Sequence, residues 1–64
     1  MADDVGYRLY RVPEAIEILG IGRSTLYELI RSRRLRSVKQ GRRRLIPASA
    51  LAEYVALLEQ EAAQ

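Results

Sequence analysis

The stretch that decides the fold runs from Gly20 to Arg44 and reads GIGRSTLYELIRSRRLRSVKQGRRR. A glycine turn opens a short helix, which we expect from Arg23 to about Arg33, and a second glycine turn precedes three consecutive arginines. At about 100° per residue, the apolar side chains of this helix fall on one side and form a buried stripe. The opposite side carries guanidinium, hydroxyl and phenol groups, which are donors that suit a DNA groove. The stripe is Leu26, Leu29 and Ile30, and the outer face is Arg23, Ser24, Tyr27, Glu28, Arg31 and Arg34.

A second short helix is expected just before this stretch, over Pro13–Leu19. Proline suits a helix start because its φ is already helical and its missing N–H has no partner there. Gly20 can take the left-handed conformation that ends a helix, and Gly22 can serve as the next N-cap. Two short helices joined by such a turn form a helix-turn-helix.

Residues 35–46 change to a period of two and predict a two-stranded hairpin, here called the wing. Its turn candidate is residues 40–42, because Gly41 supplies a positive φ. An isolated hairpin is marginally stable in water, so the wing must pack on the helices. The alternating segment from Tyr7 to Val12 is a candidate third strand.

After Pro47, apolar residues again follow helical spacing and predict a third helix from about Ala48 to Glu61. We expect its stripe, Leu51, Tyr54, Val55 and Leu58, to lie over the first two helices. The predicted fold is therefore mainly α with a small β-hairpin: a winged helix-turn-helix of three helices plus a wing. The domain is expected over residues 7–61, between a flexible N-terminus (1–6) and a frayed C-terminus (62–64).

Size and composition exclude several classes of protein. The chain has 64 residues, enough for one small core, and contains neither cysteine nor histidine. Without these residues we expect no disulfide, no thiolate or imidazole metal site and no histidine base, and hence no enzyme and no cofactor. No apolar run approaches the roughly 20 residues that span a bilayer. Asp3 and Asp4 also occupy the place of a basic signal-peptide region, so we expect a cytoplasmic protein without membrane contact.

The formal net charge of +3 conceals a strong asymmetry. Residues 1–30 carry three arginines against five acids, and residues 48–64 carry three acids and no base. Residues 31–47 carry seven arginines and one lysine with no acid. Such a basic pole is typical of a protein that binds a polyanion, foremost nucleic acid. The alternative, a solvated basic face, fits less well because apolar residues interrupt the charges at regular spacing.

The candidate DNA contacts lie at the start of the second helix and in the wing. In a helix-turn-helix the first turns of the second helix read base edges. Arg23 suits either a bidentate guanine contact or a phosphate contact, and Glu28 suits either cytosine or solvent. Arginine at a narrow hairpin tip fits the minor groove, which makes Arg42 the leading wing candidate. The full set of candidates is Arg23, Ser24, Thr25, Tyr27, Arg31, Lys39, Arg42, Arg43 and Arg44.

Other residues have structural alternatives. Strand alternation places Arg43 with Leu45 and Arg44 with Ile46, so the wing arginines cannot all point one way. Thr25 lies off the outer face and has capping or packing as its alternative role. For Tyr10 and Tyr54 we expect packing roles. Three more arginines, Arg33, Arg34 and Arg36, are ambiguous because they could equally pair with Glu14 or Glu17.

Four segments resemble the excisionase-type winged helix-turn-helix domains, which are related to the DNA-binding domain of MerR-type regulators. They are YRVPEA at 10–15, GRSTLYELIRS at 22–32, LRSVKQGRRR at 35–44 and LIPASAL at 45–51, and the resemblance covers about residues 9–58. Two positions depart from the family pattern. Ile16 stands where a small residue is usual, which suggests a wider helix crossing, and Gly22 replaces the usual serine N-cap.

The resemblance implies a DNA-binding architectural factor of a phage or mobile element, also called a recombination directionality factor. Such proteins bind repeated sites on double-stranded DNA, bend it, assemble cooperatively and direct a tyrosine integrase toward excision. In the family, residues matching Arg23, Ser24, Thr25, Tyr27, Arg42 and Arg43 contact DNA. The alternatives are a small MerR-like transcriptional regulator and a protein-interaction module whose basic pole binds an acidic partner.

Overall fold

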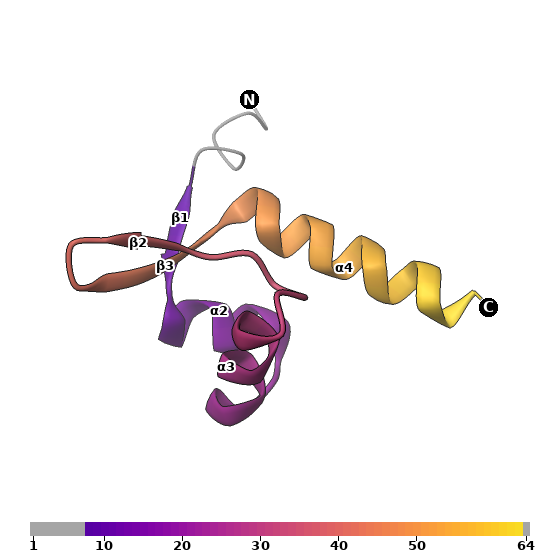
Figure 1. The fold of residues 1–64 in the computed structure, drawn as a ribbon. Helices are drawn as coiled ribbons and strands as arrows, with labels where there is room; N and C mark the ends of the chain where they lie inside the picture. The colour runs from indigo at the N-terminus through magenta and orange to yellow at the C-terminus, as the bar shows by residue number, and fades with distance from the viewer. Residues whose placement is uncertain (1–7, 64) are drawn as a thin grey trace.

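The computed structural model describes residues 8–63, which form three helices and three short strands. Figure 1 shows the wing and the last helix extending in opposite directions from a centre where the two short helices lie against the sheet. This architecture confirms the predicted winged helix-turn-helix with an added N-terminal strand. Residues 1–7, which include the predicted flexible N-terminus, and residue 64 lie outside the described range. The elements are β1 (Leu9–Arg11), α2 (Val12–Leu19), α3 (Arg23–Arg31), β2 (Val38–Gln40), β3 (Arg43–Pro47) and α4 (Ala48–Ala62).

The sheet is antiparallel, with strand order β1-β3-β2, so β3 is its central strand. On the wing side Gln40 pairs with Arg43 across a turn that contains Gly41, whose φ is +62°. On the other side Arg11 of β1 pairs with Leu45. Because a hairpin alone is marginally stable in water, the third strand supports the wing where it leaves the core.

The turn between α2 and α3 depends on a left-handed glycine, as predicted. Gly20 has φ 67°, and its N–H donates to the carbonyl of Ile16 at 2.8 Å, which closes the last turn of α2. Gly22 is extended and forms the N-cap of α3 without any side-chain hydrogen bond. The conformation at Gly20 favours glycine because a Cβ there meets its own carbonyl oxygen.

Helix α2 begins one residue earlier than expected, at Val12, so Pro13 is its second residue rather than its first. The cause is a side-chain cap at the preceding position. The Glu14 carboxylate accepts a hydrogen bond from the backbone N–H of Arg11 at 2.8 Å. Helix starts leave such N–H groups unpaired, and Glu14 therefore satisfies one of them while it also favours the positive end of the helix.

Helix α3 ends at Arg31, two residues before the expected Arg33. Arg33 has φ 67°, a left-handed backbone conformation that interrupts the helix. Its N–H donates to the carbonyl of Ile30 at 3.1 Å, and the N–H of Arg34 donates to that of Leu29 at 3.0 Å. These two bonds are a Schellman motif, in which glycine is the usual left-handed residue. The periodicity of the sequence continues past this point, so only the conformation of Arg33 reveals the stop.

The core lies where α2, α3, α4 and β3 meet. Leu26, Leu35 and Ile46 are the largest fully buried side chains, and Ala15 is completely buried on α2. Tyr54 is buried and Tyr10 packs against the same cluster, which confirms the packing roles expected for both. Leu26 and Leu29 of the predicted stripe are buried, and Ile30 is partly buried against them.

Helix α4 covers the core with only the first half of its apolar stripe, contrary to expectation. Leu51 is buried together with Tyr54, whereas Val55 and Leu58 are 43% and 40% exposed. The helix has 15 residues against eight in α2 and nine in α3, so its C-terminal half extends past them (Figure 1). It ends at Ala62, one residue beyond the expected Glu61. None of the helices within residues 8–63 is long and apolar enough to cross a bilayer.

Candidate nucleic-acid interface

The outer face of α3 is exposed along its whole length. Its buried side carries Leu26 and Leu29, and the core holds them at 0% and 9% exposure. This packing fixes the rotation of the helix about its axis, so that the polar side must face solvent. The exposed residues include all five of the predicted contacts on this helix: Arg23, Ser24, Thr25, Tyr27 and Arg31.

The wing turns its tip away from the core. Gly41 and Arg42 form the turn, and both are exposed, as are Lys39 and Arg43 at the adjoining ends of the two strands. Rigid support comes from further along β3, where Leu45 and Ile46 are buried. The wing therefore presents a narrow cationic tip on an anchored base.

A hollow of about 490 Å³ separates α3 from the wing, and we call it the basic groove. One wall is the start of α3, and the opposite wall is the hairpin. The start of α2 closes one end, with Val12 and Pro13 at its border. The charged and aromatic side chains around it are Arg11, Arg23, Tyr27, Lys39, Arg42, Arg43 and Arg44. Six of the nine residues predicted to contact DNA thus border one concave surface, although they come from segments far apart in the sequence.

The groove is strongly cationic. Six basic side chains line it, and no carboxylate does among residues 8–63. Within residues 8–63, none of these six cations forms an ion pair, because the three ion pairs there involve other arginines. Fields from like charges in a concave surface add, which raises the local concentration of anions.

Arg44 differs from the other wing arginines. Its side chain is only partly exposed, and its Nη1 donates to the Ser37 hydroxyl at 2.9 Å. The register agrees with the predicted alternation, because Arg44 pairs with Lys39 and lies on the same strand face as the fully buried Ile46. Arg43 lies on the opposite face of the sheet and pairs with Gln40. The wing arginines therefore approach the groove from both faces of the hairpin.

Three predicted contacts lie outside the groove. Ser24 and Thr25 are exposed on the first turn of α3 but do not border the hollow. Arg31 is one turn beyond Tyr27, and its Nη1 donates to the Glu28 carboxylate at 2.8 Å. Both partners of this ion pair are about 70% exposed, so water screens it and the guanidinium can exchange partners at little cost.

Arg11 borders the groove although it was not among the predicted contacts. It closes β1, is exposed and pairs with Leu45, which places it on the same sheet face as Arg43. A third strand beside β3 aligns its alternate residues with those of the wing, but which residues align depends on the register between the two strands. The expected strand had no assigned register, and without a register Arg11 could not be placed.

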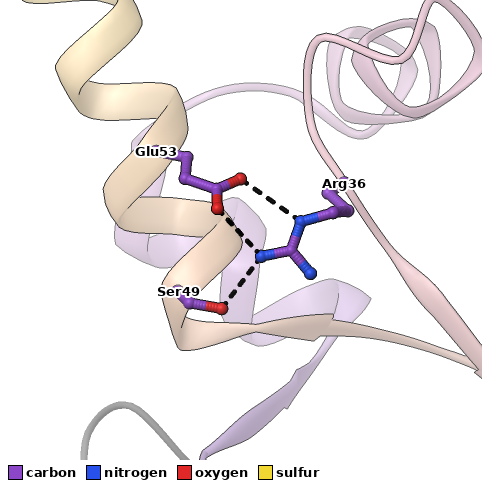
Figure 2. Close-up of polar contacts among 3 residues, drawn as sticks. All are labelled: Arg36, Ser49 and Glu53. Atoms are coloured by element: carbon purple, nitrogen blue, oxygen red, sulfur yellow. Dashed lines mark hydrogen bonds and ion pairs between the residues drawn. The ribbon is translucent and has the colours of Figure 1, made fainter.

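Two of the three ambiguous arginines, Arg34 and Arg36, do have carboxylate partners, but these are not Glu14 or Glu17. Arg36 donates from Nε and Nη2 to the Glu53 carboxylate at 3.2 and 3.1 Å, and from Nη2 to the Ser49 hydroxyl at 3.0 Å (Figure 2). Arg34 donates to both carboxylate oxygens of Glu61 at 3.0 and 2.8 Å. Pairing with a glutamate was one of the two alternatives, and the partners come from α4 because segment 33–37 runs beside α4 rather than beside α2.

The second of these contacts shifts the titration of both partners. The hydrogen bond from Arg34 holds the pKa of the Glu61 carboxyl below its usual value. The same hydrogen bond, together with the negative charge of Glu61, raises the pKa of Arg34. Both groups stay charged near neutral pH, and this paired arrangement contrasts with the unpaired cations of the basic groove.

Comparison with known proteins agrees with this geometry. The helix-turn-helix domain family matches residues 9–56. A protein named "Excisionase" from Streptomyces ambofaciens is 43% identical over 47 residues, which cover 73% of this chain and 76% of that protein. A protein named "Probable excisionase" from Saccharopolyspora erythraea is 44% identical over 50 residues, 78% of this chain but only 51% of the relative. The chain thus spans about half the length of the second relative, and no solved structure matches it significantly.

The fold and the matches define the class as a winged helix-turn-helix of the DNA-binding type. Within that class, the chain belongs to the excisionase-type helix-turn-helix family.

Proposed function

We propose that this protein is a DNA-binding architectural factor, an excisionase that binds repeated sites near an attachment site and directs a tyrosine integrase toward excision. The observation that carries the DNA-binding part is the basic groove between α3 and the wing. It offers six basic side chains, and no carboxylate of the described part of the chain borders it. The names of the relatives support the excisive role, and the family resemblance alone supports the integrase partner.

In this proposal α3 enters the major groove with its first turns against base edges. The major groove is wide enough for one helix and displays a distinct donor and acceptor pattern for each base pair. Arg23 is the proposed bidentate guanine contact. Ser24, Thr25 and Tyr27 donate to bases or phosphates, and Arg31 contacts the backbone one turn later.

The wing then lies along the adjacent minor groove. Its narrow tip brings Arg42 and Arg43 to a region of enhanced negative potential. Lys39 and Arg44 contact the phosphates that flank the tip. Neutralisation of phosphates on the side of the duplex that faces the protein favours bending, which fits the proposed architectural role.

Copies of the protein that bind neighbouring repeats side by side would also associate cooperatively on DNA. In this arrangement the acidic α4 of one copy approaches the basic pole of the next. The proposed location of the protein is the cytoplasm, where it is associated with the nucleoid when bound to DNA.

The test is footprinting of the purified protein on the attachment region of its host element, with and without the cognate integrase. We expect protection of regularly spaced repeats, bent DNA in circular-permutation gels, and excisive recombination that requires the protein. Protection of a promoter operator, without any effect on recombination, would favour the MerR-like regulator. A flat dependence of affinity on salt would favour the protein-interaction module, because several phosphate contacts make log affinity fall steeply with log salt.

A further inference from the structure

A second hollow, of about 550 Å³, lies between the end of α3, the base of the wing and α4. We call it the arginine hollow. Arg33, Arg34, Arg36 and Arg44 border it together with Glu53, above apolar side chains of α3 and the following segment. Arg44 also borders the basic groove, so the two hollows adjoin at this side chain.

The arginines of this hollow fall into two groups. Arg34 and Arg36 are each held by both oxygens of a glutamate on α4. Arg33 forms no ion pair within residues 8–63, and Arg44 donates to the neutral Ser37. Glu61 and Glu53 thus neutralise Arg34 and Arg36, and the positive charges of Arg33 and Arg44 remain without an ion-pair partner among residues 8–63.

Arg33 stands in a conformation that an arginine adopts only at a cost. Its φ of 67° lies in the left-handed region, at the position of the Schellman motif where glycine is usual. The side chain of Arg33 is exposed and contributes nothing to the core. Backbone strain of this kind concentrates at functional sites, where the side chain supplies something that glycine cannot.

We propose that the arginine hollow binds phosphate groups of a nucleic-acid backbone, with Arg33 as the principal contact. A guanidinium offers a planar pair of donors that matches two phosphate oxygens. Arg34 and Arg36 are positioning residues, because their carboxylate partners fix the wall of the hollow against α4. Figure 2 shows the contact of Arg36. The inference rests on the proposed DNA binding and extends it. The phosphates belong either to the duplex that occupies the basic groove or to a second duplex.

The decisive variant is Arg33→Gly, because it removes the positive charge and also relieves the backbone strain at this position. We expect its thermal unfolding midpoint to equal or exceed that of the parent, since glycine suits φ 67°. Its DNA affinity should nevertheless fall, and the slope of log affinity against log salt should shrink by about 0.9, the value of one phosphate contact on B-DNA. When the salt concentration rises from about 50 to 200 mM, Arg33→Gly should therefore lose about threefold less of its DNA affinity than the parent loses.

Two further variants serve as controls. Arg33→Lys keeps the charge and should retain the parental slope, whereas Arg33→Asn tolerates the left-handed conformation and should behave like Arg33→Gly. A merely structural role for Arg33 would change the midpoint and leave the slope untouched. An Arg33→Gly protein that binds DNA with parental affinity and slope would overturn the proposal.

Duplex design separates the two sources of phosphate. If one duplex fills both hollows, the Arg33→Gly deficit appears on a long duplex and disappears when the end beyond the groove contact is trimmed. If a second duplex is held, the parent brings two differently labelled duplexes together in a fluorescence coincidence assay, and Arg33→Gly does not. Failure of the parent to bind any duplex would overturn the proposed function and this inference with it. Parental binding with no Arg33 effect on either readout overturns this inference alone.

Discussion

The basic groove and the flank of α4 use arginine in opposite ways. Around the groove, Arg23, Arg42 and Arg43 have no ion-pair partner within residues 8–63. Beside α4, Arg34 and Arg36 are each bound by two carboxylate oxygens of a glutamate, 27 and 17 residues further along the chain. A count of charge along the sequence treats these arginines alike. The fold decides which of them are available to a polyanion and which hold α4 in place.

The largest loss of DNA affinity from a single substitution in either region should follow the removal of the Arg23 side chain. Arg23→Ala should weaken binding to the cognate site by about 1–3 kcal/mol, the value of a bidentate base contact, and weaken nonspecific binding less. Gel-shift titrations on cognate and scrambled duplexes measure both effects. If both duplexes lose affinity equally, Arg23 contacts phosphate rather than guanine.

The wing tip should show a smaller effect that depends on salt rather than on sequence. Arg42→Ala should weaken binding to every duplex and reduce the slope of log affinity against log salt by about 0.9. Arg8→Ala is the matched control, because it removes the same charge from an exposed arginine that borders neither hollow. The special role of the wing tip fails if Arg8→Ala reduces the slope as much as Arg42→Ala does.

Substitutions in the ion pair beside α4 should instead change the stability of the fold. Arg36 and Glu53 are 49% and 63% exposed, so their coupling in a double-mutant cycle should be about 0.2–1 kcal/mol of unfolding free energy. Urea unfolding of Arg36→Ala, Glu53→Ala and the double variant measures this coupling. No coupling would mean that the contacts of Figure 2 do not hold α4 in solution.

The smallest expected effect is a pH dependence at the end of α4. Because the hydrogen bond from Arg34 lowers the pKa of folded Glu61, the charged form stabilises the native state above the usual glutamate value of 4.5. That contribution is lost as the pH falls through the lower folded pKa. Glu61→Gln should therefore be slightly less stable than the parent at pH 7, and the difference should vanish in acid. A difference that persists in acid would assign the effect of Glu61 to packing.

The sequence predicted the architecture well because its local signals agree with one another. The left-handed Gly20, the turn at Gly41 and the stripe of Leu26 and Leu29 all occur where expected. Each of these features follows from the conformational preference of a single residue or from helical spacing. The residues now lining the basic groove were mostly predicted for the same reason, since one helix face and one hairpin tip define them.

Features that depend on two distant segments were missed. The register of β1 against β3, which brings Arg11 to the groove, is set by tertiary packing and has no signal within residues 7–12. The partners of Arg34 and Arg36 depend on the path of segment 33–37, which the left-handed Arg33 redirects toward α4. Arginine is rare in that conformation, and periodicity alone therefore extended α3 too far.

No loop separates the central strand from the last helix. Pro47 closes β3 and Ala48 opens α4, while the other end of the same strand forms one side of the wing. The strand that carries the wing and α4 are therefore joined by a single peptide bond, and no flexible segment between them can absorb a rotation. A protein that binds α4 and tilts it must therefore also rotate the wing tip. Binding at α4 and DNA binding by the wing are then mechanically coupled through the main chain.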